Sequence, residues 1–351
     1  MTEEILVVDD LRTWFPIKAG LLQRTTGHVR AVDGVSLKVR RGETYGLVGE
    51  SGSGKTTLGK SILRLIEPTG GTVLFDGIDV TKATKGNVKK LRRRIQIIFQ
   101  DPYASLDPRQ TVGSTLSEAM RTHGLVASKA DAIRHAKELL RRVGLNEEHL
   151  FRFPHEFSGG QRQRVAVARA LAVDPDFIVL DEPTSFLDVS VQAQVLDLLK
   201  DLQKELNLTY VFISHNLSVV QYMSNRVGVM YLGRLMEDAE RDSIYNSPEH
   251  PYSYYLMAAI PIPDPEFKKV PKLLSGDVPS PVNIPPGCRF HPRCPYATEK
   301  CRAGEVPFYV GSGSHHNVAC HYSIDFERGA QTLRPASLTQ AAEARTRSQA
   351  G

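Results

Sequence analysis

Short apolar runs and longer amphipathic stretches alternate along most of this chain. The apolar runs at residues 45–48, 95–99, 177–180, 210–213 and 227–231 predict buried strands. The run at 177–180, Phe-Ile-Val-Leu, has no polar position, which is typical of a central parallel strand covered on both faces. Strands that alternate with helices predict an α/β fold with a parallel sheet wrapped by helices.

Helices are predicted where apolar positions recur every three or four residues. The clearest case is 132–143, whose apolar residues share one face and are followed by Gly144, a residue typical of a helix C-terminus. Residues 101–170 as a whole differ from the rest of the chain in their sequence pattern and predict a helical subdomain inserted in the α/β core. Further helices are predicted at 57–66, 165–173, 191–206 and 252–260.

An antiparallel start is predicted at residues 5–48, ahead of the parallel core. Apolar and polar residues alternate between 35 and 39, as in a half-buried strand. Another strand is predicted at 72–75, and the glycine-containing segment 18–28 is predicted to be a loop.

The composition changes after residue 245. Prolines cluster between Pro248 and Pro295, and all four cysteines lie between residues 288 and 320. Large apolar residues become rare near the end of the chain, as in disordered segments. We therefore expect an α/β domain at 1–245, a small Pro- and Cys-rich domain at 246–328 and a disordered tail at 329–351.

The overall charge excludes little. A net charge of +5 with 24% charged residues is ordinary for a soluble protein, and the basic run at 89–94 is more typical of a solvated face than of a nucleic-acid site. We expect no nucleic-acid partner. No apolar run approaches the roughly 18 residues of a membrane span, and the acidic N-terminus lacks a secretory signal, so a cytosolic location is expected.

The segment Gly49-Glu-Ser-Gly-Ser-Gly-Lys-Thr56 matches the phosphate-binding loop G-x-x-x-x-G-K-[ST] at every position. It follows a predicted strand and opens a predicted helix, so backbone N–H groups and the helix N-terminus would face the phosphates. Lys55 is expected to reach the β- and γ-phosphates, and the Thr56 hydroxyl to hold Mg²⁺. The predicted nucleotide-binding residues here are Gly49, Ser51, Gly52, Ser53, Gly54, Lys55, Thr56 and Thr57.

Two carboxylates, Asp181 and Glu182, follow the apolar run at 177–180. The carboxyl ends of parallel strands face the ligand crevice in open α/β sheets. Asp181 is therefore predicted to lie on the magnesium side of the site, acting through water, and Glu182 to polarise the water that attacks the γ-phosphate. The alternative is an acidic pair in a solvated turn.

A second phosphate-suited helix start is predicted at Phe157-Ser-Gly-Gly-Gln161, just before the helix at 165–173. Ser158 fits an N-cap, and the two glycines allow close approach of a phosphate. A single nucleotide site has no evident use for both helix starts.

Together these motifs resemble the ATP-binding-cassette (ABC) ATPases over about residues 5–240. In that family two cassettes dimerise head to tail, and each ATP lies between one P-loop and the partner's signature motif. Residues 157–161 resemble that signature, with Phe157 in place of the usual Leu. The resemblance implies a P-loop NTPase (RecA-like) ABC cassette that uses ATP and Mg²⁺, with nucleotide contacts from Ser158, Gly159, Gly160 and Gln161.

The resemblance extends to the catalytic motifs. Gln100 stands at the Q-loop glutamine, which serves magnesium and coupling, and Asp181 at the magnesium-site aspartate. Glu182 stands at the catalytic glutamate, and His215 at the switch histidine, in Ile-Ser-His-Asn where Thr-His-Asp is common. Catalytic roles are thus implied for Glu182, His215 and Gln100.

Two further positions resemble the family. Ser185–Asp188 is similar to the D-loop, with Phe186 where Ala is usual. Phe15 is implied to stack on adenine, with Trp14 and His28 as rivals.

Four stretches outside these motifs resemble the ATPase subunits of dipeptide and oligopeptide importers: 100–108, 188–194, 250–252 and 287–295. Those importers pair two different cassette subunits, and the intact Ser-Gly-Gly-Gln is more like the second, catalytically complete type. The implied partners are a second ABC ATPase subunit (hetero- or homodimer), two integral membrane permease subunits and an extracytoplasmic substrate-binding protein. The chain would then lie peripherally on the cytoplasmic face of the membrane and power import of di- or oligopeptides, or of nickel or opines.

The cysteines Cys288, Cys294, Cys301 and Cys320 are separated by five, six and eighteen residues. Disulfides are disfavoured in a cytosolic chain, and the C-x₂₋₄-C pair usual for structural zinc is absent. Four thiolates fit a [4Fe–4S] cluster, which the related importers carry; zinc and free thiols are the alternatives. Nearby histidines are expected to be solvated rather than ligands: His291, His315, His316 and His321.

Two rival functions belong to other classes. A soluble cassette ATPase acting on DNA or ribosomes typically has a coiled coil or a second cassette, and neither pattern appears. A degenerate, non-enzymatic partner would lack some of Lys55, Gln161, Glu182 and His215, all of which are present.

Overall fold

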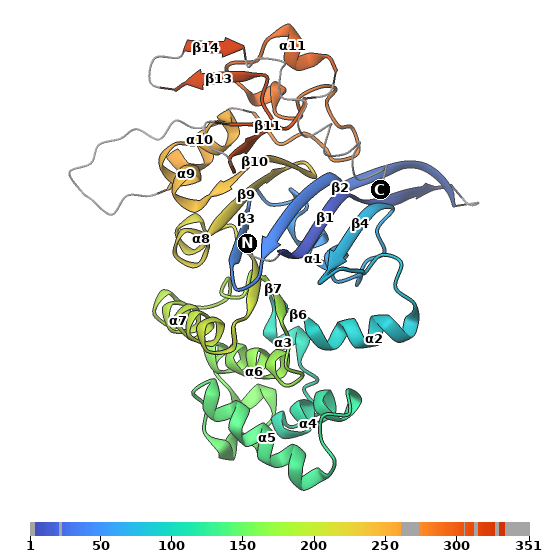
Figure 1. Ribbon diagram of the computed structural model, residues 1–351, viewed down its shortest axis with the longest axis vertical. Helices are drawn as coiled ribbons and strands as arrows, with labels where there is room; N and C mark the ends of the chain where they lie inside the picture. The colour runs from blue at the N-terminus through green and yellow to red at the C-terminus, as the bar shows by residue number, and fades with distance from the viewer. Residues whose placement is uncertain are drawn as a thin grey trace, which may run out of the picture. The chain divides into compact units, whose positions relative to one another are not determined.

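The computed structural model describes residues 4–20, 23–260, 274, 276–304, 306–311, 315–326 and 330–333 (Figure 1). The chain forms two compact units. The first comprises the chain up to Thr13, Gly34–Leu47 and Lys55–Asn225, and the second comprises Trp14–Asp33, Val48–Gly54 and the chain from Arg226 onward. Each unit is described by itself below.

Parallel strands form the core of the first unit. Their order is β3 (Thr44–Val48), β8 (Thr209–Ile213), β7 (Phe177–Asp181) and β6 (Ile95–Ile98). All residues of β3, β7 and β8 are buried, which explains why their sequences contain almost no polar side chains. The strands predicted at 177–180 and 210–213 are confirmed within one residue at each end.

Helices pack against these strands through small and apolar residues. In α1 (Lys55–Ile62), a Cβ at Gly59 would lie 3.0 Å from side chains of both Ile213 and Val179, so this helix approaches the strands closely. The helix α7 (Val189–Leu206) follows β7, and α8 (Leu217–Met223) follows β8. No helix among the described residues is both long and apolar enough to cross a lipid bilayer.

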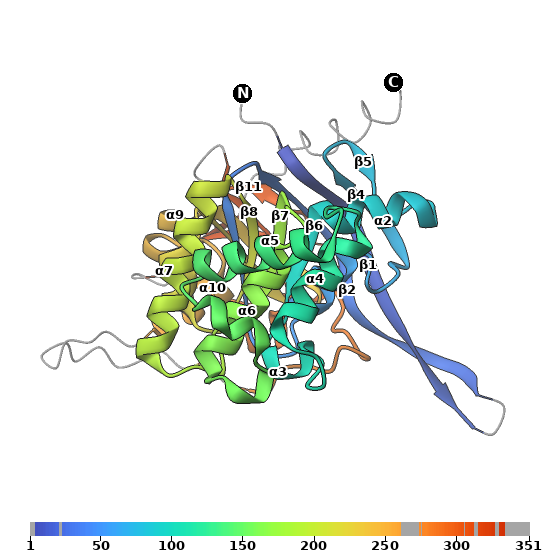
Figure 2. The same cartoon turned by 90° about the horizontal axis from the view of Figure 1, so that it is seen from below.

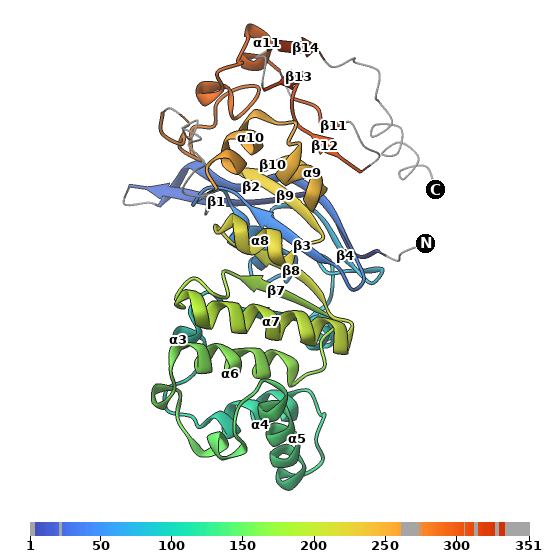
Figure 3. The ribbon, with the colours of Figure 1, turned by 90° about the vertical axis from the view of Figure 1, so that its left-hand side faces the viewer.

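Residues 101–170, all described, contain helices and turns and no strand. The helices α4 (Val112–Thr122) and α5 (Lys129–Arg142) contact each other and α6 (Gly159–Leu171), which in turn contacts α7. Figure 3 shows α6 and α7 running side by side, and in Figure 2 α4, α5 and α6 lie in front of β6, β7 and β8. The remaining helices of the unit are α2 (Lys85–Arg94), α3 (Pro102–Ser105), η1 (Glu147–Phe151) and η2 (Pro154–Glu156).

The antiparallel start predicted by the sequence is present, with one correction. β1 (Glu4–Ala19) pairs antiparallel with β4 (Gly70–Phe75), which pairs with β5 (Ile78–Asp79). β2 (Arg24–Arg40) is the other neighbour of β1, so the loop predicted at 18–28 is wrong. Most residues of this hairpin end are exposed, so they have no apolar alternation that would reveal strands.

The second unit contains an antiparallel set in the order β9 (Arg226–Tyr231), β10 (Arg234–Glu240), β12 (Asn317–Val318) and β11 (Tyr309–Val310). The boundary predicted at residue 245 lies inside this unit. Part of the predicted tail is a strand, because β14 (Ala330–Leu333) pairs with β13 (Tyr322–Asp325); residues 334–351 lie outside the described residues. The helices of the unit are α9 (Arg241–Asn246), α10 (Pro251–Ala258), η3 (His291–Arg293) and α11 (Glu299–Arg302).

Candidate functional site

Asp181 and Thr56 are paired in the first unit. The Thr56 hydroxyl, in the first turn of α1, donates a 2.8 Å hydrogen bond to Oδ1 of Asp181, the last residue of β7. Asp181 is 3% exposed, and burial raises the pKa of its carboxyl. A divalent cation at this pair would favour the ionised carboxylate and offset the cost of burying it.

Glu182 is held by the two other residues predicted to be catalytic. The Gln100 amide donates to Oε2 of Glu182 at 3.0 Å, and His215 Nδ1 lies 3.1 Å from the same oxygen. Gln100 follows β6, Glu182 follows β7 and His215 follows β8. The ends of three neighbouring parallel strands therefore bring these three side chains together. The carboxylate therefore has a fixed position at the carboxyl ends of the strands.

The backbone of Glu182 adopts the left-handed region, with φ of +48°. A non-glycine residue there stores strain of order 1–3 kcal/mol and stays there only when its surroundings hold it. Here the Glu182 N–H donates to the Ile213 carbonyl at 2.9 Å, and its own carbonyl accepts from the Ser185 hydroxyl at 3.1 Å. Such strain is typical of functional positions.

The glycine loop at 49–54 is packed tightly within the second unit. Gly49, Gly52 and Gly54 have φ of +150°, +78° and +104°. A Cβ at Gly49 would lie 2.1 Å from the Met230 carbonyl oxygen, and one at Gly54 would lie 2.0 Å from the Ala31 carbonyl oxygen. Only glycine fits these two positions.

The other predicted nucleotide-binding residues of this segment differ in their exposure. Ser53 is buried and its carbonyl accepts the Gly233 N–H at 2.9 Å, whereas Ser51 is exposed. Lys55, the first residue of α1, is 6% exposed, and Thr57 is half-buried. Direct contacts of these residues with a nucleotide stay a prediction.

The second predicted helix start is well formed. Ser158 caps α6: its hydroxyl accepts from the Gln161 N–H at 3.3 Å, and the Gln161 side chain accepts from the Ser158 N–H at 3.1 Å. Gly159 and Gly160 form the first turn, and a Cβ at Gly160 would lie 2.2 Å from a methyl group of Val191 on α7. Glycine at 160 thus lets α6 and α7 approach each other.

The aromatic residues proposed for adenine differ in their surroundings. The Trp14 indole N–H donates to Asp33 at 3.0 Å, and the Arg30 guanidinium lies 4.8 Å from its ring centroid. The His28 ring lies 6.0 Å from Trp14 between centroids. Phe15 is 38% exposed on β1, and it stays the predicted stacking residue.

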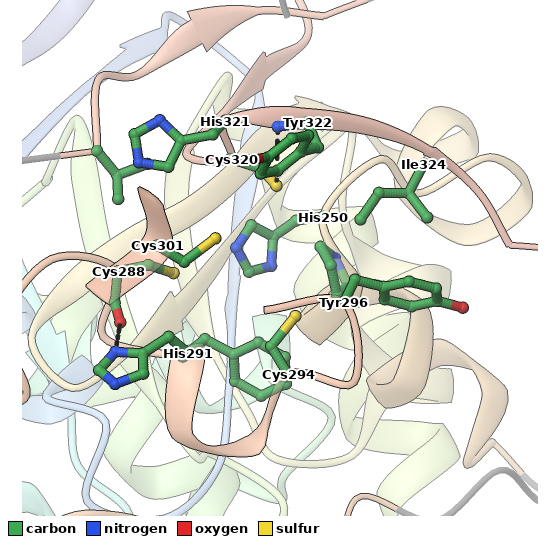
Figure 4. A pocket seen from close by; sticks show the side chains of 13 residues that line it. His250, Cys288, His291, Cys294, Tyr296, Cys301, Cys320, His321, Tyr322 and Ile324 are labelled. Carbon is green, nitrogen blue, oxygen red and sulfur yellow. Dashed lines mark hydrogen bonds between the residues drawn. The ribbon is translucent and has the colours of Figure 1, made fainter. Parts of the chain in front are cut away.

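All four cysteines line one small pocket in the second unit. Figure 4 shows their side chains directed into this space from separate segments of the chain, with His250 also lining it. Burial raises the pKa of Cys288 to about 11 and that of Cys294 to about 12, and none of the four forms a disulfide. The donor set therefore fits a thiolate-bound group, whose positive charge would offset the cost of ionising buried thiols.

The cysteines as they lie do not form a metal-binding group. Across the described part of the chain, no three His, Cys, Asp or Glu side chains are grouped closely enough to hold a metal ion. Tetrahedral zinc, with Zn–S of about 2.3 Å, draws its thiolates much closer together than a four-iron cluster does.

Two of the neighbouring histidines were wrongly predicted to be solvated. His316 is 4% exposed, and its Nε2 lies 2.6 Å from Oε1 of Glu237. His321 is 5% exposed, and within the described residues neither ring nitrogen has a hydrogen-bond partner; burial also lowers its pKa. His321 lines the cysteine pocket, so it faces the space that a thiolate-bound group would fill.

Sequence reasoning also missed two arginines between the first two cysteines. Arg293 forms an ion pair with Glu50 of the glycine loop, and Arg289 forms one with Asp33. The only local signal was the position of Glu50, directly after Gly49 in the phosphate-binding motif.

Comparison with known proteins identifies relatives over nearly the whole chain. The ABC transporter family model matches residues 32–185, and the model for the C-terminal region of oligopeptide/dipeptide transporters matches residues 236–301. The oligopeptide transport ATP-binding protein AppF of Bacillus subtilis is 48% identical over 322 residues, which cover 91% of this chain and 97% of that protein. A Brucella ovis protein described as a peptide import ATP-binding protein is 52% identical over 298 residues, covering 85% and 93%.

Solved structures confirm the fold class predicted for the α/β part. A dimeric ATP-binding cassette in a post-hydrolysis state, bound to ADP and phosphate, matches with a TM-score of 0.60 and 29% identity over 67% of this chain and 98% of that one. The cbiO1 protein of Clostridium perfringens, part of an ABC transporter complex, matches with a TM-score of 0.58 and 28% identity over 70% and 92%.

The packing of the glycine loop predicts a difference between two alanine substitutions. Gly54→Ala places a methyl group against the Ala31 carbonyl oxygen at φ +104°, whereas at Gly52 nothing lies within 4 Å and φ is +78°. Gly52→Ala should therefore cost only the left-handed penalty of about 1–2 kcal/mol, and Gly54→Ala clearly more. Urea unfolding of the nucleotide-free protein measures both; equal losses would contradict the close approach at Gly54.

Proposed function

Because this chain belongs to the family of ABC transporter ATP-binding proteins, we propose that its ATP hydrolysis drives import of peptides through a membrane transporter. The chain is an ABC ATPase, and hydrolysis of ATP is the enzymatic activity of this family. The observation that carries the proposal is the Glu182 carboxylate, held by Gln100 and His215 next to the buried Asp181–Thr56 pair.

In this proposal Glu182 is the general base. Its carboxylate holds the attacking water and takes its proton as the water oxygen bonds to the γ-phosphorus and the bond to the β-phosphate oxygen breaks, which leaves ADP. Gln100 and His215 keep the carboxylate in place for that transfer. Thr56 and Gln100 would hold Mg²⁺ directly and Asp181 through water; the bound ion supplies charge that stabilises the phosphates.

We further propose that the site is completed by a second cassette. The glycine loop and the Ser158–Gln161 helix start both suit a phosphate, and one nucleotide per subunit uses only one of them. Exposed apolar side chains support the idea: Phe186 is 68% exposed and Val189 is 85% exposed, beside the capped start of α7. Burial of such residues in a head-to-tail dimer would remove apolar area from water.

The peptide cargo and the partners are part of the same proposal. The match of residues 236–301 to the C-terminal region of oligopeptide/dipeptide transporters supports a peptide over nickel or an opine. We propose a functional division into a cassette at 1–245 and a C-terminal domain at 246–328. The cassette would pair with a second ATPase subunit and bind two permease subunits at the cytoplasmic face of the membrane, with an extracytoplasmic binding protein selecting the peptide.

For the four cysteines we propose a [4Fe–4S] cluster, with zinc as the alternative. The support is that Cys288, Cys294, Cys301 and Cys320 all line one pocket, since four cysteines are the ligand set of such a cluster. When bound, such a cluster would cross-link a proline-rich segment that has little apolar core of its own.

The role of Glu182 gives the first functional prediction. In the assembled transporter, Glu182→Gln should keep ATP binding and lower ATP turnover about 10²–10⁴-fold, because the amide cannot accept the proton. The matched control is Glu205→Gln, an exposed carboxylate on α7, which should leave turnover unchanged. Near-normal turnover in Glu182→Gln would remove Glu182 from the mechanism.

Cross-linking tests the shared site. A photo-reactive label on Ser158→Cys, in the ATP-bound Glu182→Gln complex, should attach to the glycine loop of the partner subunit. The same label on Ser114→Cys, exposed on α4, should not reach either loop. Mass spectrometry identifies the peptides. Attachment to the loop of its own subunit alone would rule out a head-to-tail arrangement.

Metal analysis tests the cluster. Anaerobically purified protein should be brown, absorb broadly near ~400 nm and contain about four irons per chain. Cys301→Ser should increase hydrogen exchange in residues 280–325 and leave the strands β7 and β8 protected, since the ligand loss is local. Stoichiometric zinc without iron would keep the cross-link and exclude the cluster.

A further inference from the structure

The turn between Cys288 and Cys294 carries two buried arginines that extend out of the cysteine pocket. Backbone hydrogen bonds shape it: the His291 N–H donates to the Cys288 carbonyl at 3.0 Å, and the Arg293 N–H donates to the Phe290 carbonyl at 3.0 Å. Arg289 is 4% exposed and Arg293 is 8% exposed. Both arginines belong to the turn that bears Cys288 and Cys294, so the backbone that places these two cysteines also places the arginines.

Arg293 reaches the glycine loop, which belongs to the same compact unit. Its Nη1 and Nη2 donate to the two carboxylate oxygens of Glu50 at 2.7 and 3.1 Å, a bidentate pair. The backbone of Glu50 is held as well, because its N–H donates to the Tyr252 hydroxyl at 2.9 Å. Glu50 follows Gly49 directly, so this contact fixes the first turn of the phosphate-binding loop.

A cluster of aromatic rings packs around the contact between Arg293 and Glu50. The rings of Tyr231, Tyr252 and Phe290 are fully buried, with centroids 4.8 to 5.5 Å apart. The guanidinium of Arg293 lies 5.9 Å from the Tyr231 ring centroid, and Nη1 lies 3.5 Å from its hydroxyl. Arg293 therefore has little freedom to leave Glu50.

Arg289 makes the corresponding contact at the other end of the turn. It donates to the Asp33 carboxylate and to the Leu232 carbonyl. The other oxygen of Asp33 accepts from the Trp14 indole, and Trp14 precedes Phe15, the residue predicted to stack on adenine. One turn thus contacts the phosphate loop directly and, through Asp33, the strand β1 that bears Phe15.

We propose that Arg293 is a positioning residue for nucleotide binding: it orders the glycine loop through Glu50 and neutralises a carboxylate that would otherwise repel the incoming phosphates. The inference rests on the proposed function, since it assumes that the loop binds a nucleotide. Two physical effects act in the same direction. Without Arg293 the loop must be ordered during binding, and the Glu50 charge, no longer neutralised by that guanidinium, opposes the anionic ligand.

These effects predict a specific pattern of MgADP affinities, measured by calorimetry on the full-length chain. Arg293→Gln should weaken binding about three- to thirtyfold, the range usual for coupling through a neighbouring network. Glu50→Gln should weaken it less, because it removes the repelling charge and keeps the N–H bond to Tyr252. Adding Glu50→Gln to Arg293→Gln should restore the affinity to that of Glu50→Gln alone.

The matched control is Arg226→Gln, which breaks another buried ion pair of the same unit, with Asp238 at 2.9 Å. It should lower the unfolding midpoint without changing MgADP affinity. Additive losses in the double variant, or an Arg293→Gln affinity no lower than that of Arg226→Gln, would overturn the inference and leave the proposed function intact. Absence of MgADP binding by the unsubstituted chain would overturn both.

Discussion

The close approach of the glycine loop to neighbouring backbone is the constraint on which the nucleotide-binding arrangement depends. At Gly49 and Gly54 a side chain would collide with a carbonyl oxygen about 2 Å away, so the path of the loop is possible only for glycine. That path ends where α1 begins at Lys55, and the next residue, Thr56, hydrogen-bonds Asp181. The shape of the loop is therefore set by backbone packing inside its own compact unit.

The Glu182 carboxylate is placed by contacts between neighbouring strands, whereas the second helix start is built by local structure. Glu182 is placed by its strained backbone and by contacts with Gln100 and His215 from adjacent strands. Ser158 and Gln161 form a reciprocal cap that organises the start of α6 without any ligand. Both elements are therefore already formed in the single chain.

Several of these elements could be predicted because each depends on a pattern of neighbouring residues in the sequence. The strand at 177–180, the long helix after it and the phosphate-binding motif each have short-range signatures, and the structure confirms the elements within a few residues. The exposed hairpin end at 18–28 has no apolar period and was read as a loop. The burial of His316 beside Glu237 and the pairing of Arg293 with Glu50, 243 residues away, depend on tertiary contacts that no sequence period records.

The central claim is that ATP hydrolysis by this chain moves peptide across a membrane, and transport in proteoliposomes tests it most directly. The complete transporter is reconstituted with ATP enclosed, and labelled dipeptide and the binding protein are supplied outside. The account predicts that labelled peptide accumulates inside against its gradient while ADP is produced, and that neither occurs with enclosed ADP alone. Sustained ATP hydrolysis without any peptide accumulation would contradict it.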